Sequence, residues 1–201
     1  MGLDSKRSAA DRYIDALSKP FMGFSPNSLS GISTVFALLF GIFYYIGRIF
    51  LVFAIISLIL SAVLDAVDGK VARTRNLASK KGDLVDHFLD RVSDIFIISG
   101  IGLSAYAGSI YALLGLEGVL LTSYMGTQSQ ALGIGRDYSG LMGRADRLVA
   151  VLAFTLIQLI LPFHYSLYNI LLTPSTILLL WFFIAGNITA VQRFSSAFRK
   201  L

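Results

Sequence analysis

Two neighbouring stretches of the chain decide the fold: Leu64-Asp65-Ala66-Val67-Asp68-Gly69-Lys70-Val71-Ala72-Arg73 and Gly82-Asp83-Leu84-Val85-Asp86-His87-Phe88-Leu89-Asp90-Arg91. Asp65 and Asp68 are spaced i, i+3, and Asp86 and Asp90 are spaced i, i+4, so each pair lies on one face of a helix. The connection between the stretches is short, which makes the two helices antiparallel neighbours. We therefore expect the four carboxylates to converge.

These acidic stretches lie within a strongly apolar chain. Of its 201 residues, 55% are hydrophobic and 14% charged, whereas soluble domains carry about 25% charged residues. A membrane span needs about 20 mostly apolar residues. Six segments qualify, at residues 28–47, 49–72, 83–106, 109–132, 146–163 and 173–195. The sequence therefore predicts an all-α polytopic membrane protein, with six transmembrane helices in one domain over residues 26–201.

Basic residues mark one side of the predicted membrane domain. With six spans, only Arg48 of the seventeen Lys and Arg residues lies in a connection on the opposite face. In membrane proteins, cytoplasmic connections carry the excess of Lys and Arg. We therefore expect a multi-pass protein of the cell membrane whose termini and acidic stretches are cytoplasmic.

Residues 1–25 are predicted to form a juxtamembrane amphipathic segment. Leu3, Ile14 and Leu17 can share one helix face, while Lys6 and Arg7 can meet anionic headgroups. The stretch has no apolar core ahead of a cleavage site, so we expect no cleaved signal peptide. The chain has no cysteine, which excludes disulfides and thiolate metal sites.

The four aspartates need neutralisation. A carboxylate within a membrane costs roughly 2.5–3.5 kcal/mol on insertion scales, and four of them together repel one another. Oxygen ligands select hard cations, and two metal ions held by carboxylates commonly handle phosphates. Hard divalent cations such as Mg²⁺, Mn²⁺ or Ca²⁺ would therefore neutralise Asp65, Asp68, Asp86 and Asp90, and among them we expect Mg²⁺ or Mn²⁺, as two ions.

Small residues accompany the acids. Gly69 and Ala72 continue the face of Asp65 and Asp68 and leave room for a phosphate-bearing group, and Arg73 can neutralise a phosphate oxygen. Two other interpretations are an interfacial network of ion pairs and a cation transporter. Lone ion pairs do not require Gly and Ala beneath the acids, and the acids cluster at one end of the spans instead of midway.

The pattern Asp65-x2-Asp68-Gly69-x2-Ala72-Arg73-x8-Gly82-x3-Asp86-x3-Asp90 resembles the signature of the CDP-alcohol phosphotransferases at all eight fixed positions. The resemblance implies that Asp65, Asp68 and Asp86 bind metal, and that Asp90 is the general base and a further ligand. It also implies attack of an alcohol on the β-phosphorus of a CDP-lipid, with CMP leaving, and a homodimer. The implied CDP-binding residues are Asn27, Asp68, Gly69, Ala72, Arg73 and Gly82.

The acceptor is predicted from a basic stretch before the fifth span. Arg144 and Arg147, spaced i, i+3, can present two guanidinium groups to one phosphate, and the helix N-terminus adds to that field. Arg136 and Gln128 are further candidates. The alternative is that these arginines are only topology signals.

Within the family, the segment Gly143 to Leu148 resembles the arginine-containing segment of members that use inositol phosphate, and the whole stretch from Ser123 to Leu148 resembles the archaetidylinositol phosphate synthases. Bacterial phosphatidylinositol phosphate synthases carry a lysine and an arginine where this chain has Gly126 and Gln128. We therefore expect a CDP-lipid donor, CDP-archaeol or CDP-diacylglycerol, and an inositol 1-phosphate acceptor. The alternatives are glycerol 3-phosphate or serine as acceptor, a CDP-inositol donor with inositol phosphate, and a non-catalytic membrane scaffold. No nucleic-acid partner is expected.

Two further expectations concern single features. His87 follows Asp86 directly, and one helical step turns it about 100° away, so we interpret it as an interfacial residue. Small residues in the fourth and sixth spans are compatible with a dimer contact.

Overall fold

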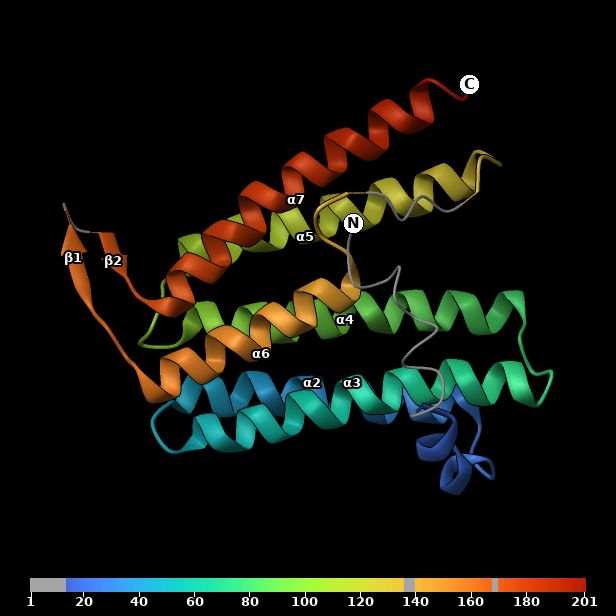
Figure 1. Cartoon of the computed structure of the whole chain (residues 1–201), viewed down its shortest axis with the longest axis horizontal. Helices are drawn as coiled ribbons and strands as arrows, with labels where there is room; N and C mark the ends of the chain where they lie inside the picture. Colours follow the sequence, from blue (N-terminus) through green and yellow to red (C-terminus); the bar gives the residue numbers. More distant parts are fainter. Residues whose placement is uncertain (1–13, 136–139, 168–169) are drawn as a thin grey trace. The chain divides into compact units, whose positions relative to one another are not determined.

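A computed structural model describes residues 14–135, 140–167 and 170–201. Six long helices follow one another in this part of the chain (Figure 1), and each coincides with one predicted span. They are α2 (Pro26–Ile46), α3 (Phe50–Thr74), α4 (Lys80–Leu103), α5 (Ser109–Ala131), α6 (Arg144–Ile160) and α7 (Pro174–Phe198). Other elements in the described residues are the helical residues 14–18, the short 3-10 helix η2 (Lys19–Phe21) and the strands β1 (Tyr165–Leu167) and β2 (Ile170–Leu172).

Four of the described helices are long and apolar enough to cross a membrane: α2, α3, α5 and α7. The other two, α4 and α6, begin with charged turns. Asp83, Asp86 and Asp90 fall in the first half of α4, and Arg144, Asp146 and Arg147 open α6. The all-helical, membrane-type fold predicted from the sequence is therefore present, with four clear candidate spans.

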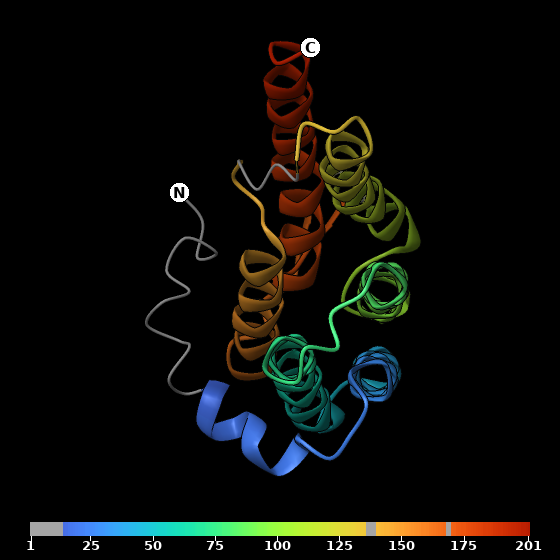
Figure 2. The ribbon, with the colours of Figure 1, turned by 90° about the vertical axis from the view of Figure 1, so that its right-hand side faces the viewer.

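Local sequence sets where α2 begins and ends. The hydroxyl of Ser25 accepts a hydrogen bond from the backbone N–H of Ser28 at 3.1 Å, and Pro26 occupies the first helical turn, where a missing N–H costs nothing. Gly47 ends the helix with a φ of 74°, a conformation that glycine adopts without a steric penalty. The tight turn returns the chain as α3, which lies beside α2 (Figure 2).

The described residues form two compact units, one up to Gly100 and the other from Ile101 onward. In the first unit, α2 and α4 cross at two glycines. A Cβ on Gly100 would lie 2.3 Å from the Cα of Gly41, and a Cβ on Gly41 would lie 2.5 Å from the carbonyl oxygen of Phe96. Only glycine allows the two backbones to come this close, so this crossing sets the distance between α2 and α4.

In the second unit, α5 and α7 cross in the same way. A Cβ on Gly186 would lie 2.5 Å from the backbone of Gly118, and the hydroxyl of Thr122 donates to the carbonyl of Gly186 at 2.8 Å. These glycines of the fourth and sixth predicted spans therefore pack against each other within one protomer. The side chain of Gln158 on α6 accepts a 2.8 Å hydrogen bond from the hydroxyl of Ser175 on α7.

A short hairpin precedes α7, and the sequence did not predict it. Strands β1 and β2 pair in antiparallel fashion, with Tyr165 opposite Leu172. Pro162 and Pro174 bracket the segment, and proline cannot continue a helix. The intervening backbone still needs hydrogen-bond partners, and it finds them by pairing with itself.

Part of the predicted juxtamembrane segment, residues 1–13, lies outside the described residues. Residues 14–18 are helical and lead into η2. Two contacts join this region to the end of α3: Asp15 forms an ion pair with Lys70, and the guanidinium of Arg75 donates to the carbonyl of Phe24 at 2.9 Å.

Candidate metal and nucleotide site

The first unit brings the acids of α3 and α4 together. Asp65, Asp68 and Asp86 each offer a carboxylate oxygen, and these oxygens lie within 4.8 Å of one another. Asp86, His87 and Asp90 form a second group within the same distance, so Asp86 belongs to both groups. The convergence arises because helical spacing aligns each pair of acids and the short connection after α3 sets α4 beside it.

A serine on α2 contacts this group. The hydroxyl of Ser30 donates to Oδ2 of Asp68 at 2.6 Å. Ser30 is 6% exposed and Asp68 5%, so the bond is shielded from water. The contact joins residues 38 positions apart, and no local sequence pattern points to it.

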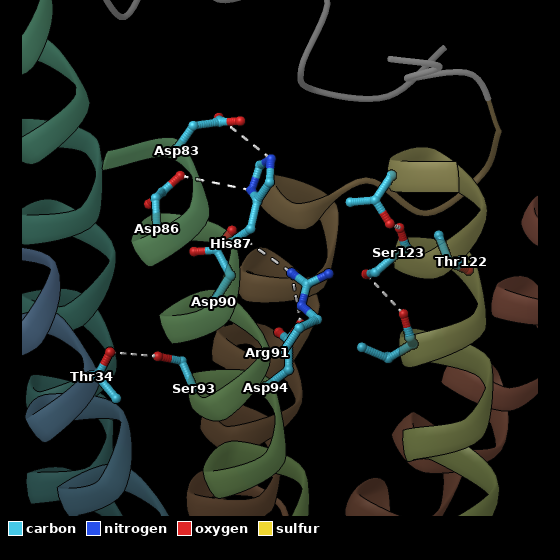
Figure 3. A network of polar contacts seen from close by, with 12 residues as sticks. Thr34, Asp83, Asp86, His87, Asp90, Arg91, Ser93, Asp94, Thr122 and Ser123 are labelled. Atoms are coloured by element: carbon cyan, nitrogen blue, oxygen red, sulfur yellow. Dashed lines mark hydrogen bonds and ion pairs between the residues drawn. The ribbon is translucent and has the colours of Figure 1, made fainter. Parts of the chain in front are cut away.

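Polar side chains continue along α4 beyond Asp86, as Figure 3 shows. Nη2 of Arg91 lies 3.1 Å from Oδ2 of Asp94 and 3.7 Å from Oδ2 of Asp90. Arg91 thus bridges two acids one turn apart, and Asp94 helps to keep this cation near Asp90.

The imidazole of His87 lies among the acids near the start of α4. Nε2 of His87 is 3.5 Å from Oδ1 of Asp83, and Nδ1 is 4.0 Å from Oδ2 of Asp86 (Figure 3). The sequence predicted that His87 points away from the Asp86 face. Its side chain is long enough to reach back, and the ring is close enough to Asp86 and Asp90 to join an ion-binding group.

The predicted nucleotide-binding residues belong to the same unit as the acids. A Cβ on Gly69 would lie 3.5 Å from Nη1 of Arg73, so this guanidinium folds back over the glycine. A Cβ on Gly82 would lie 3.8 Å from Oδ1 of Asn27, which places the start of α2 beside the start of α4. Ala72 is half-buried on α3.

The predicted acceptor residues belong to the second unit. Arg144 begins α6, and Arg147 follows one turn later and is buried. Oδ2 of Asp146 accepts the backbone N–H of Gly143 at 3.0 Å, so it caps the helix that carries both arginines. Gln128 is half-buried near the end of α5, and Arg136 lies outside the described residues.

The second unit also holds a buried cation that the sequence did not single out. Arg193 on α7 is 7% exposed, and its Nη1 donates to the carbonyl of Thr122 at 2.8 Å. In the sequence, Arg193 is only a basic residue near the end of the last apolar segment. The positive-inside rule already accounts for such a residue, so nothing in the sequence indicated that it would be buried.

The fold and the first unit together define the class of protein. It is a multi-pass helical membrane protein in which carboxylates from two neighbouring helices, α3 and α4, come together to form one acidic group. The chain belongs to the CDP-alcohol phosphatidyltransferase family, whose model matches residues 24–185. The resemblance drawn from the eight-position signature is therefore confirmed, and with it the transferase class of the family.

Two curated relatives are archaetidylinositol phosphate synthases. The protein from Methanothermobacter thermautotrophicus is 38% identical over 96 residues, which cover 48% of this chain and 49% of that protein. The protein from Pyrococcus horikoshii is 32% identical over 130 residues, which cover 65% of this chain and 68% of that protein. The chain thus aligns with about half of the first relative and about two thirds of the second.

Solved structures of a phosphatidylinositol phosphate synthase from Mycobacterium tuberculosis share the fold. The structure with CDP-DAG bound has a TM-score of 0.70 at 22% sequence identity, and the superposition covers 92% of this chain and 94% of the mycobacterial chain. A structure of the same enzyme with manganese and citrate has a TM-score of 0.69, and the superposition covers 90% of this chain and 88% of the mycobacterial chain.

Proposed function

We propose that this chain transfers the phosphate-linked lipid of a CDP-lipid to inositol 1-phosphate, and releases CMP. The observation that carries the proposal is the convergence of Asp65, Asp68 and Asp86, with Asp90 one turn further along α4. Similarity to archaetidylinositol phosphate synthases supports the acceptor. The CDP-DAG bound to the mycobacterial enzyme supports a CDP-lipid donor, which is either CDP-diacylglycerol or CDP-archaeol.

The residues at this site fit a divalent cation. Carboxylate oxygens are the ligands that Mg²⁺ and Mn²⁺ prefer, and the oxygens of Asp65, Asp68 and Asp86 are close enough to share ions. Manganese in the mycobacterial enzyme agrees with this choice. Two bound Mg²⁺ or Mn²⁺ ions would neutralise the pyrophosphate and stabilise charge on the departing CMP.

The protein side chains have separate tasks in this reaction. Asp90 takes the proton of the attacking hydroxyl as the oxygen bonds to the β-phosphorus and the bond from that phosphorus to CMP breaks. Arg73 contacts a phosphate oxygen of the donor, and Gly69 and Ala72 leave space for it. Asn27 and Gly82, which lie close together at the helix starts, bind the nucleotide part.

Arg144, Arg147 and Gln128 bind the acceptor, together with Arg136. Two guanidinium groups one turn apart at a helix N-terminus suit a phosphomonoester. A serine acceptor brings no phosphate and needs less positive charge. Glycerol 3-phosphate carries the same phosphate as inositol 1-phosphate, so the remaining hydroxyls of the acceptor must distinguish the two. Gln128 is the residue suited to that task, because its amide both donates and accepts.

The proposed setting is a membrane domain over residues 26–201 that crosses the bilayer six times, with α4 and α6 as the two less apolar spans. The juxtamembrane segment, of which the structure describes residues 14–25, contacts the cytoplasmic surface in this proposal. Both termini and the acidic site face the cytoplasm, because the basic connections gather there. The active form is a homodimer.

The decisive experiment measures CMP release by the purified protein in detergent, with a CDP-lipid and Mg²⁺ or Mn²⁺. Inositol 1-phosphate, glycerol 3-phosphate, serine and free inositol are each tested as acceptor. Release with inositol 1-phosphate alone is the expected result. If CMP is released only with glycerol 3-phosphate or serine, the reaction proposed for the aspartates stands, but inositol 1-phosphate is not the acceptor. Absence of release with every acceptor would favour a non-catalytic scaffold.

A further inference from the structure

We propose that Ser30 is a positioning residue that orients the carboxylate of Asp68 for divalent cation binding. The proposal rests on the proposed function, because it assigns a role to a neighbour of the acidic group. Ser30 belongs to α2, which contributes no acid to the site. The structure therefore gives α2 a part in the site that the acidic signature does not contain.

The first argument is the geometry of the contact. The distance from Oγ of Ser30 to Oδ2 of Asp68 is 2.6 Å, in the range of a strong hydrogen bond from a hydroxyl to a carboxylate. Fixing one oxygen of a carboxylate fixes the plane of the group and hence the directions in which it offers electron pairs. Side chains that hold metal ligands in this way typically change metal affinity 10- to 100-fold when they are mutated.

The second argument is that the hydroxyl favours the acid over its own helix. Helical serines commonly donate to the carbonyl four residues earlier, and Oγ of Ser30 lies 3.1 Å from the carbonyl of Pro26. The contact with Asp68 is 0.5 Å shorter, from the difference between the two distances. A hydroxyl has one hydrogen to donate. Because the contact with the Asp68 carboxylate is shorter and charge-assisted, the hydroxyl of Ser30 donates to Asp68 more strongly than to the carbonyl of Pro26.

The third argument is the place of Ser30 in a polar row along α2. Asn27, Ser30 and Thr34 recur at helical spacing and thus share one face. Asn27 lies beside Gly82 at the start of α4, and Thr34 accepts a hydrogen bond from Ser93 of α4 at 3.3 Å (Figure 3). Ser30 lies between Asn27 and Thr34 in the sequence. The polar face of α2 that contacts α4 therefore also contacts Asp68 of α3.

The neighbouring Ser33 provides a matched control. It lies on the same helix, is buried, and donates to the backbone carbonyl of Ser61 on α3 at 2.9 Å. Ser33→Ala therefore removes a buried serine hydrogen bond between α2 and α3 that involves a backbone carbonyl and no acid. A general loosening of helix packing would affect both variants alike.

The test measures Mn²⁺ binding by the full-length protein in detergent, using the electron paramagnetic resonance signal of free Mn²⁺. Wild type, Ser30→Ala, Ser30→Cys, Ser30→Thr and Ser33→Ala are compared at equal folded concentration. Cysteine has nearly the volume of serine and is a weak donor, so it carries the test if Ser30→Ala does not fold. We expect Ser30→Ala and Ser30→Cys to weaken binding about 10- to 100-fold, with Ser30→Thr and Ser33→Ala within about threefold of wild type.

Each other outcome has a distinct meaning. Wild-type affinity in Ser30→Ala or Ser30→Cys overturns the positioning role and leaves the proposed function intact. Equal losses in Ser33→Ala and Ser30→Ala also overturn it, because packing would then explain the effect. Absence of Mn²⁺ binding in the wild type contradicts the proposed metal site itself.

Discussion

The crossing of α2 and α4 allows a sharp test of how packing supports the site. In Gly100→Ala, the added methyl group would lie 2.3 Å from the Cα of Gly41, and ordinary van der Waals contact begins at 3.4 Å. The two backbones must therefore separate by about 1 Å. Overpacking of this kind costs typically 1–3 kcal/mol, less the 0.5–1 kcal/mol or so that alanine gains over glycine within a helix.

Gly31→Ala is the control for this prediction. Gly31 lies in α2, the other helix of this crossing, and a Cβ there would meet nothing within 4 Å. Both variants share the gain in helix propensity, so their difference isolates the steric term of about 1–3 kcal/mol. The measurement is loss of helical circular dichroism on heating in mild detergent, followed by CMP release at a temperature at which both variants are folded.

We expect Gly100→Ala to unfold at a lower temperature than Gly31→Ala. Its activity should fall as well, because α4 carries Asp86 and Asp90, and a misplacement of about 1 Å can cost about 100-fold in rate. A Gly100→Ala protein as stable and active as Gly31→Ala would refute the reasoning that this backbone contact sets the position of α4.

Three further outcomes follow from the proposed chemistry. Asp90→Asn should lower CMP release by about 100-fold or more while the other acids still bind Mn²⁺; an active variant would remove Asp90 as the base. Arg144→Gln should raise the KM for inositol 1-phosphate about 10- to 100-fold with the KM for the CDP-lipid unchanged, and an equal rise in both would contradict an acceptor-specific role. Chelation with EDTA should abolish CMP release and added Mg²⁺ or Mn²⁺ should restore it, whereas release that persists in chelator would exclude a metal requirement.

The acidic group illustrates what could be predicted locally. Helical spacing aligned Asp65 with Asp68 and Asp86 with Asp90, and the short connection implied that the pairs face each other. These relations depend only on helix periodicity and on the length of the connection between the helices, and both can be read from a single sequence. His87 was less predictable, because angular position on a helix does not describe how far a long side chain reaches back.

Glycines were harder to interpret from the sequence. Gly118 and Gly186 indicated that a close approach of helices was possible, but the pattern does not name the partner. The structure places them against each other within one protomer, and the dimer contact stays a prediction. A small residue is permissive, and its partner depends on the arrangement of whole helices.

The sequence by itself determined the family, the helix boundaries to within a few residues, and the acids that gather at the site. Those properties follow from periodicity, hydropathy and a dense local signature. The hydrogen bond from Ser30 to Asp68 and the glycine contact of Gly41 with Gly100 were decided only by tertiary structure, because each joins residues far apart in the chain. The hairpin before α7 is a local structure that the sequence analysis did not predict. It forms because a backbone between two prolines must satisfy its own hydrogen bonds.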